Sequence, residues 1–592
     1  MASILKAAFV LPLLSQLAQA AFVPAPTDLK TTTGYYDQQV RYKQVPEGIC
    51  ELTPGVKSYS GYVDIAENQH IFWWFFESRN QDPSEAPLTV WINGGPGSSS
   101  MIGLFQELGP CGVDSNGEVY NNPYAWNNVS NMLFIDQPAQ TGFSYSIPIP
   151  GYTSSAGDIV QLPDTECPGY AHGCATYSYP SPAYTANSTK NAAPGMWKTL
   201  QGFMGAFPQY SRSGFHFATE SYGGHYGPVF NEYIEKQNAL IDRGELSGAH
   251  KIQLESVLIG NGWYDPLIQY EAFYNFSVNP GNTYDLTLGS ARLEKQMYNG
   301  MYGKGNCYDQ TEQCRRSGRN DVCQQADNFC YQEVEYILDI ATGRDEYDVR
   351  YLVPDPFPYN FYVEYLNTPK VQQALGAFVN FTDGSRIVST AAFGNTGDDD
   401  RLQGAVKDSR KLVEQGIYMV QFYGDADYVC NWIGGEVVAN NIDSPGFSTA
   451  GFANITSSDD IVHGVSKQSD NFAFVRIYEA GHEVPFYQPV VALEMFERVI
   501  NGYDVATGKI KIKQGAGIAT AGPAQSLFRE GNGTVQTKVV PTSATYNTTT
   551  NGPNPFGNST SKAVGRRKKR NYRPMPAVAL HKREYAAEFN GI

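Results

Sequence analysis

The most informative segment of the chain is FHFATESYGGHYGP, residues 215–228. An apolar run leads into ESYGG at 220–224, and a helical pattern then covers residues 223–237. A serine on such a sharp strand-to-helix turn exposes its hydroxyl group, and the strained backbone requires small neighbours. This pattern marks Ser221 as a candidate nucleophile. Thr219 stands where a glycine is more usual, so the alternative is a glycine-rich turn whose serine only caps the helix.

Short apolar segments recur on both sides of this turn and are separated by helical patterns. Residues 61–76 predict a β-hairpin, and residues 366–375 predict a helix with Thr368 as N-cap and Pro369 at its first position. The predicted single strands are 88–92, 131–135, 215–218, 254–259, 417–422 and 472–477. This alternation indicates an α/β fold with a mostly parallel central sheet and helices on both faces. In such sheets, functional sites form at the carboxyl ends of the strands.

Two loops downstream of Ser221 can supply the base and the orienting acid that a nucleophilic serine needs. One loop follows the strand at 417–422 and carries Asp425 and Asp427. The other follows the strand at 472–477 and carries His482. Serine, acid and histidine thus occur in the chain order expected after a strand-turn-helix serine. Spacing does not separate Asp425 from Asp427, so both remain candidates for the acid.

A glycine loop can complete an acyl-transfer site. WINGGPG, residues 91–97, follows a predicted strand, and its glycines allow the backbone to approach a developing oxyanion. The residue after the nucleophile, Tyr222, can supply a second backbone N–H. Without such a partner, Gly-Gly-Pro-Gly is only a turn.

The N-terminus predicts secretion. Lys6 precedes an apolar run at residues 7–14, and Ala18-Gln19-Ala20 provides small residues at the usual cleavage spacing. A buried N-terminal helix is the alternative. No other stretch reaches the ~18 apolar residues of a membrane-spanning helix, so we expect a secreted, extracellular protein without a transmembrane segment.

An oxidising compartment allows cysteines to form disulfides. Eight of the nine cysteines can then pair, and one is left over. Four cysteines between residues 307 and 330 predict two local bridges in a loop-rich excursion, and Cys167 and Cys174 can close a short loop. We also expect N-linked glycans. The eight sequons begin at Asn128, Asn187, Asn275, Asn380, Asn454, Asn532, Asn547 and Asn558.

Net charge and motif content argue against some classes of partner and cofactor. The 592 residues carry a net charge of −16, which argues against nucleic acid as the main partner. The chain has no HExxH and no paired CxxC motif, so we expect no metal site and no cofactor. From residue 517 on, 11 Lys and Arg face 3 Asp and Glu, a net charge of +8. This segment is rich in Thr, Asn, Gly and Pro and includes the basic run 566–570, which is either a processing or wall-binding site or a solvated charge run.

These observations predict five segments. They are a signal peptide at 1–20, a first core part at 21–270, an inserted disulfide-rich cap at 271–360, a second core part at 361–515, and a basic, disordered tail at 516–592.

The blocks WINGGPGSSS, IDQPAQTGFSY, ESYGGHYGP, YGDADYVCNW and AGHEVP resemble those of the serine carboxypeptidase family, in that family's order. The resemblance covers roughly residues 45–505 and is greatest to secreted members from filamentous fungi related to carboxypeptidase Y. It implies an α/β-hydrolase fold, with Ser221 as nucleophile, Asp427 as acid and His482 as base. It also implies Gly95 and Tyr222 as oxyanion donors.

The resemblance further implies residues that bind the substrate. Asn93 and the N–H of Gly94 would bind the C-terminal carboxylate of a peptide, together with Glu107 and Glu220. Two carboxyl groups beside a substrate carboxylate repel it unless they hold protons, so we expect an acidic pH optimum. Cys430 would be the unpaired thiol, and with Glu483 it would line a side-chain pocket that tolerates basic residues.

One departure from the family pattern concerns the backbone. Gln140 replaces a usual glycine in the block that begins at Ile135.

The sequence therefore predicts a secreted serine carboxypeptidase that removes C-terminal amino acids from peptides and proteins through an acyl-enzyme. An acyltransferase or esterase that uses the same residues is one alternative, because an alcohol can also resolve an acyl-enzyme. A non-catalytic binding protein on the same scaffold is another. Besides the extracellular space, the cell wall and the vacuole are open as locations.

Overall fold

The computed structural model describes residues 22–278, 281–355, 357–401 and 404–539, and the backbone of 546–547 and 552–553. The predicted signal peptide at 1–20 lies outside the described residues, as does most of the predicted tail from residue 540 on.

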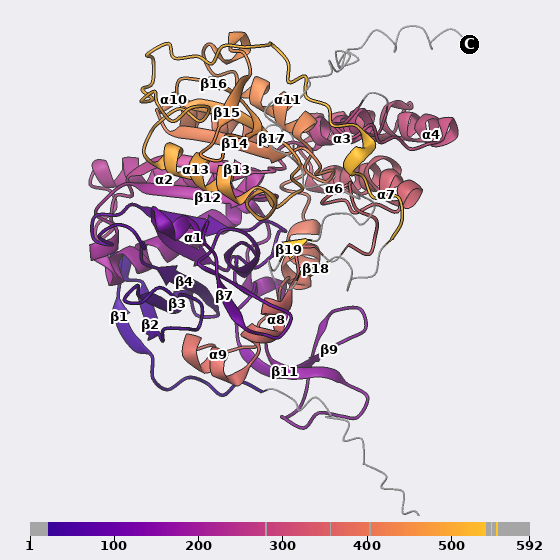
Figure 1. Ribbon diagram of the computed structural model, residues 1–592. Helices are drawn as coiled ribbons and strands as arrows, with labels where there is room; N and C mark the ends of the chain where they lie inside the picture. Colours follow the sequence, from indigo (N-terminus) through magenta and orange to yellow (C-terminus); the bar gives the residue numbers. More distant parts are fainter. Residues whose placement is uncertain are drawn as a thin grey trace, which may run out of the picture.

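A twelve-stranded sheet forms the centre of the described part (Figure 1). Its spatial order is β1-β2-β3-β4-β8-β5-β12-β13-β14-β17-β16-β15. The six strands from β8 to β17 run parallel, and antiparallel strands flank them at both edges. The strand bounds are β1 Lys30–Thr33, β2 Gln39–Val45, β3 Ser58–Ala66, β4 Gln69–Phe76, β5 Leu88–Ile92, β8 Asn131–Ile135, β12 Phe215–Glu220, β13 Leu254–Gly260, β14 Tyr418–Gly424, β15 Ala453–Thr456, β16 Val462–Ser469 and β17 Phe472–Ile477. The predicted hairpin and single strands are all present.

Helices cover both faces of the sheet, which explains why its central strands are apolar throughout. Side chains alternate between two cores: in β17, Phe472 and Phe474 point into one core, and Ala473 and Val475 point into the other. The first core also receives side chains from α1 Thr189–Ala206, α2 Gly223–Asp242, α10 Gly404–Glu414 and α11 Trp432–Ile442. The second receives them from the π-helical turn Gly103–Glu107, α8 Phe361–Leu366, α9 Pro369–Leu375 and α13 Pro489–Ile500.

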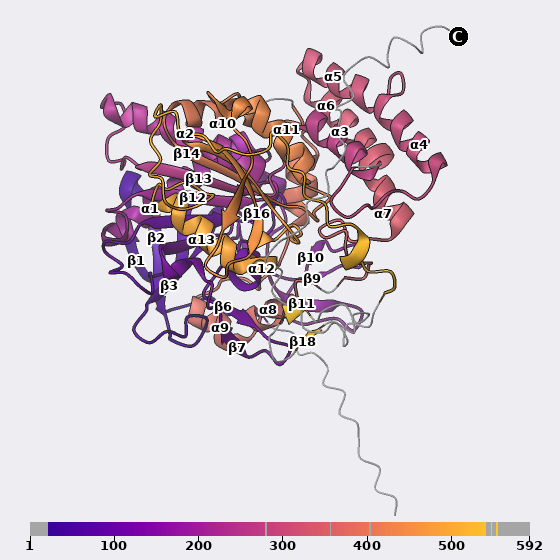
Figure 2. The same cartoon turned by 45° about the horizontal axis from the view of Figure 1, so that its top comes forward.

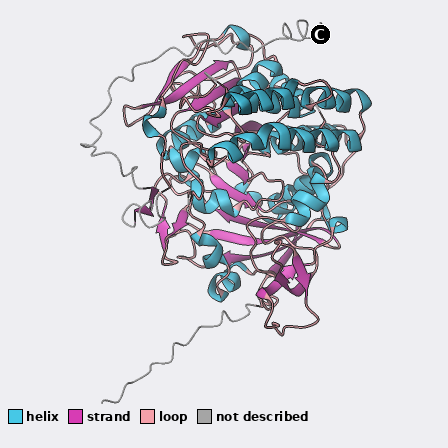
Figure 3. Ribbon diagram, turned by 90° about the vertical axis from the view of Figure 1, so that its right-hand side faces the viewer, coloured by secondary structure: helices cyan, strands magenta, loops and turns pink. Residues whose placement is uncertain are grey.

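The segment 307–330 is helical rather than loop-rich, and further helices belong to the predicted insertion at 271–360. The helices of this insertion project beside α11 in Figure 2 and face the viewer in Figure 3. They are α3 Pro266–Ser277, α4 Ala291–Tyr302, α5 Cys307–Ser317, α6 Asn320–Cys330 and α7 Tyr336–Thr342. Two local disulfides, Cys307–Cys330 and Cys314–Cys323, join α5 to α6 and confirm the predicted pair of bridges.

The remaining cysteines also agree with the prediction. Cys167–Cys174 closes a short loop, Cys50 pairs with Cys111, and Cys430 is the free thiol. The Cys167 loop belongs to a small separate sheet, which extends at the lower right of Figure 1. Its strands are β9 Pro148–Thr153, β10 Ile159–Gln161 and β11 His172–Ser178, and a further pair is β6 Cys111–Val113 and β7 Val119–Asn121.

The folded core continues past residue 515, where the predicted tail begins. Phe528 is 2% exposed and stacks on Tyr478, with ring centroids 3.8 Å apart. Residues 516–539 therefore pack on the core, which corrects their assignment to a disordered tail. Within the described residues, no helix is both long and apolar enough to cross a membrane.

Candidate active site

Ser221 lies on the turn between β12 and α2, at the carboxyl end of the sheet. Its φ is +62°, in the left-handed region that glycine adopts freely but that is uncommon and strained for a serine. A Cβ on Gly223 would lie 2.2 Å from the Thr219 hydroxyl, so this position requires glycine. Ser221 is thus held on the strained turn that the sequence predicts, with threonine accommodated at 219 because Gly223 lacks a side chain.

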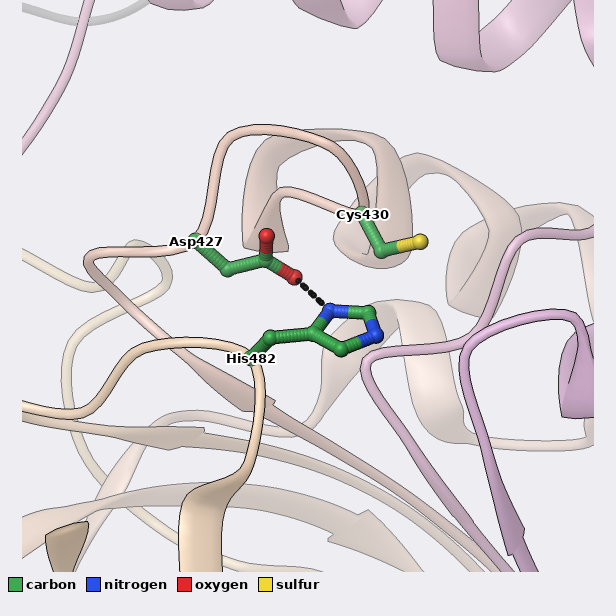
Figure 4. A group of neighbouring side chains, drawn as sticks. All are labelled: Asp427, Cys430 and His482. Atoms are coloured by element: carbon green, nitrogen blue, oxygen red, sulfur yellow. Dashed lines mark hydrogen bonds and ion pairs between the residues drawn. The ribbon is translucent and has the colours of Figure 1, made fainter. Parts of the chain in front are cut away.

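The structure separates the two candidate acids. Asp427 Oδ2 lies 2.8 Å from His482 Nδ1, and Figure 4 shows the second ring nitrogen of His482 on the side away from Asp427. Asp425 instead accepts hydrogen bonds from the Tyr284 hydroxyl at 2.6 Å and the Glu479 N–H at 2.9 Å. Asp427 is therefore the carboxylate that faces the histidine.

Cys430 connects this pair to Ser221. Its thiol, Asp427 and His482 have donor atoms that all lie within 4.8 Å of one another, and Figure 4 shows the three together. Burial and the nearby Asp427 carboxylate raise the pKa of the Cys430 thiol well above its usual value, and the hydrogen bond to the Ser221 hydroxyl opposes this shift. The protonated thiol is a poor metal ligand, and Asp427 is already engaged by His482, so the group fits an acid–base pair.

The glycine loop packs directly on the serine turn. A Cβ built on Gly94 would lie 2.4 Å from the Tyr222 backbone nitrogen and 2.8 Å from Ser221 Cβ, which only a glycine allows. Gly95 has a φ of +106°. The loop and the first turn of α2 thus bring the backbone of Gly94 against those of Ser221 and Tyr222, and Gly95 follows directly in the loop.

Asn93 is fixed at the start of this loop. Its Oδ1 accepts hydrogen bonds from Trp91 Nε1 at 2.8 Å and from the Gly103 N–H at 3.0 Å. Its Nδ2 donates to Glu220 Oε1 at 2.6 Å. The amide orientation is thereby set, and its N–H bonds face Glu220.

Three carboxyl groups gather near Asn93. Burial raises the pKa of Glu220 to about 7. Burial and the charge of Glu220 raise the pKa of Glu107 and that of Glu483 well above their usual range. The structure thus brings Glu483 together with the two glutamates predicted to contact a substrate carboxylate.

The charges of the site also act on the base. Burial lowers the pKa of His482, but Asp427, Glu220 and Glu483 outweigh it and raise that pKa above its ordinary value. Because Glu220 and Glu483 support the imidazolium form, protonating them favours the neutral imidazole that a general base requires.

Two residues that the sequence analysis did not predict contact the site. Asn261 Nδ2 donates to Asp427 Oδ2 at 2.7 Å, and the Tyr347 ring packs edge-on against His482 with centroids 5.1 Å apart. Asn261 directly follows β13 in IGNG, so the rule that sites form at carboxyl ends of strands could have found it. Nothing in the local sequence marks Tyr347, which comes from the insertion.

The chain matches one protein family along most of its length. The family model described as serine carboxypeptidase matches residues 46–502. Carboxypeptidase S1 homolog B of Arthroderma otae is 38% identical, over 86% of this chain and 84% of that protein. Carboxypeptidase S1 of Penicillium janthinellum is 39% identical, over 76% of this chain and 97% of that protein.

A solved structure supports the fold. A prohormone-processing carboxypeptidase from Saccharomyces cerevisiae superposes with a TM-score of 0.60 at 21% identity, covering 77% of this chain and 95% of that chain. The α/β-hydrolase architecture is thus shared over most of the described core. The chain belongs to the serine carboxypeptidase family.

Proposed function

We propose that Ser221, His482 and Asp427 carry out the carboxypeptidase reaction of this chain. The observation that carries the proposal is the His482–Asp427 hydrogen bond beside the strained Ser221 turn. His482 takes the Ser221 proton as Oγ bonds to the carbonyl carbon of the last peptide bond. The proton then passes to the leaving amino group as the C–N bond breaks, which leaves an acyl-enzyme.

Water resolves this intermediate in our proposal. Its oxygen bonds to the acyl carbon, its proton passes to His482, and His482 returns a proton to Ser221 Oγ as the ester breaks. The backbone N–H groups of Gly95 and Tyr222 stabilise the oxyanion in both steps.

The substrate's terminal carboxylate is bound, in this proposal, by Asn93, the Gly94 N–H and the pair Glu107 and Glu220. The support is the fixed Asn93 amide beside two buried carboxyl groups. A carboxyl group donates a hydrogen bond only while protonated, so binding weakens as pH rises through the Glu220 pKa of about 7. We therefore propose that peptide hydrolysis is favoured at acidic pH.

Cys430 and Glu483 line the proposed pocket for the terminal side chain. Glu483 is protonated at acidic pH, because partial burial and the charge of Glu220 raise its pKa. A basic terminal residue is then favoured only as pH rises and Glu483 ionises.

We also propose that the protein is secreted after removal of residues 1–20, is N-glycosylated, and acts on the C-termini of peptides and proteins. The support is the apolar run after Lys6 together with four disulfides, which persist in oxidising compartments. Residues 271–360 are proposed as a cap, because Tyr347 from this segment contacts His482.

The test is release of the terminal amino acid from a blocked dipeptide and from its C-terminal amide at mildly acidic pH, with Ser221→Ala as control. We expect release from the free acid, much weaker release from the amide, and none from the variant. Cleavage of simple esters alone, or acyl transfer to alcohols, would instead support an esterase or acyltransferase. Equal activity of Ser221→Ala would overturn the proposal, and inactivity of the wild-type enzyme on every substrate would favour a binding protein.

A further inference from the structure

Residues 345–350 of the insertion, called the splint here, bridge the two loops that carry Asp427 and His482. The bridge consists of backbone hydrogen bonds and therefore constrains the loops themselves. The bonds run from Tyr428 N to Glu346 O at 3.0 Å, from Val429 N to Glu346 O at 3.1 Å, from Val349 N to Ala426 O at 2.9 Å, and from His482 N to Tyr347 O at 2.9 Å. A Cβ on Gly481 would lie 2.6 Å from Tyr347 O, so glycine at 481 permits this close approach.

The splint is held in turn by residues 526–536, called the strap here. Gln536 is 8% exposed, and its N–H donates to Arg350 O at 2.7 Å. Its side-chain Oε1 accepts a hydrogen bond from the Leu352 N–H at 2.7 Å. Arg344 Nη1 donates to the carbonyl oxygens of both Val349 and Gln536, at 3.1 and 3.2 Å. Gln536 thus fixes the end of the splint.

The other end of the strap packs at the base of the His482 loop. Phe528 stacks on Tyr478, the residue that follows β17. The buried Arg476 of β17 donates to the Phe528 carbonyl at 3.0 Å and to the Ser526 hydroxyl at 2.8 Å. The strap therefore spans from the strand that leads to His482 to the splint that holds both catalytic loops. It lies beyond residue 502, where the match to the family model ends.

We infer that the strap, through Gln536, positions Asp427 and His482 relative to each other. This inference rests on the catalytic roles proposed above. The physical reason is that Asp427 and His482 sit on separate loops. These loops bond directly to each other before the two catalytic residues, through Ala426 N and Ala480 O at 2.8 Å, and the splint adds backbone bonds to Tyr428 and to His482 itself. Loosening the splint would misalign the pair, and a small misplacement of catalytic groups can cost as much as about 100-fold in rate.

Full-length point variants test the inference. Gln536→Leu removes the acceptor for Leu352, whereas Gln536→Glu retains an oxygen there. Gln201→Leu is the matched control. Gln201 is also buried, its Oε1 accepts the His250 N–H at 2.7 Å, and it lies on α1, outside the splint and the strap. A fluorophosphonate that labels Ser221 reports the alignment of the triad without using the terminal-carboxylate site.

We expect Gln536→Leu to lower both the labelling rate and kcat by about 5- to 20-fold, with a smaller change in KM, and Gln536→Glu to recover most of the loss. Gln201→Leu should lower Tm but leave the labelling rate of folded protein unchanged. Phe528→Leu should act in the same direction as Gln536→Leu and serves if that variant does not fold.

Wild-type labelling rates in folded Gln536→Leu and Phe528→Leu would overturn the positioning role and leave only a structural one. A wild-type enzyme that is active but not labelled at Ser221 would instead overturn the proposed function, and the inference with it. The two failures are therefore distinguishable.

Discussion

At the scale of single residues, the site places several carboxyl groups around one histidine. Glu220 bonds Asn93, lies near Glu107 and Glu483, and raises the pKa of His482 through its charge. The same group can therefore influence both substrate binding and the general base. Both effects depend on the ionisation of Glu220, whose pKa is raised to about 7, so they appear on the high-pH limb of a pH profile.

Glu220→Gln should change the falling limb of the pH dependence of kcat/KM for a blocked dipeptide. That limb, near pH 7, should weaken, because the pKa of Glu220 is raised to about 7 and glutamine does not titrate. The acidic limb should stay in place, because Glu220 is already protonated there and carries no charge that the substitution could remove. Glu235→Gln, which changes a half-buried glutamate of α2, is the control and should leave the profile as in wild type. An unchanged profile in Glu220→Gln would contradict the proposed carboxylate site.

Glu483 should make terminal-residue preference depend on pH. We expect the ratio of kcat/KM for C-terminal Arg over C-terminal Leu to rise with pH, because the raised pKa of Glu483 keeps it neutral in acid. In Glu483→Gln the ratio should stay constant. Steady-state assays on the two substrates across the pH range measure it, and a constant ratio in the wild-type enzyme would rule out this role.

Gln140 shows how a residue can depart from a family pattern at a strained position. Its φ is +77°, where glycine is normally favoured. Its side-chain amide donates to the Ser181 carbonyl at 2.6 Å and accepts from the Ser181 N–H at 3.1 Å. These two hydrogen bonds help offset the backbone strain at Gln140. The sequence alone does not reveal them, because Gln140 and Ser181 are far apart in the chain.

At the scale of secondary-structure elements, the glycine loop and the serine turn act as one unit. Gly94→Ala should lower kcat by about 100-fold, since it would displace the Tyr222 N–H and one oxyanion-hole donor is worth about that much. Gly169→Ala is the control, because a Cβ there meets no atom within 4 Å. Measurements of kcat alongside thermal unfolding separate the effect on catalysis from a loss of fold. Full activity in Gly94→Ala would mean that the contact is not needed.

Element boundaries show where local rules succeed and where they fail. The helix predicted within 366–375, with Pro369 at its first position, is α9 Pro369–Leu375, and α8 ends just before it at Leu366. Thr368 occupies the N-cap position, but its hydroxyl donates to Tyr365 O instead of accepting from α9. Pro369 starts the helix as predicted, since a proline at the first position loses no hydrogen bond.

At the scale of the whole molecule, burial decides which sequons can carry glycans. Asn275 and Asn380 are 8% and 5% exposed, and Asn380 Oδ1 accepts a hydrogen bond from the Thr176 N–H at 3.0 Å. Asn187, Asn454 and Asn532 are exposed. We expect glycans on the exposed three and none on the buried two.

Enzymatic deglycosylation in heavy-oxygen water followed by peptide mass spectrometry would locate the modified sites on protein from a eukaryotic secretory host. Asn454→Gln should remove one glycan without changing Tm. A glycan on Asn380 in folded, active enzyme would contradict the packing of this residue.

The sequence by itself determined the elements and the chemistry carried by local patterns. Apolar runs defined the central strands, because strands covered on both faces need no polar residues. The strand-turn-helix pattern located Ser221, and the odd cysteine count in a chain predicted to be secreted left one thiol over. Each of these features depends on residues that are neighbours along the chain.

Only the tertiary structure decided which distant groups meet. Asp425 and Asp427 lie two positions apart and look alike in sequence, yet Arg476 and Tyr284 face one and His482 faces the other. Likewise, no local pattern shows that residues 526–536, at the start of the predicted tail, reach the catalytic loops. Such contacts are set by strand order and by packing between segments far apart in the chain. The sequence within one segment does not indicate which distant segment it will contact.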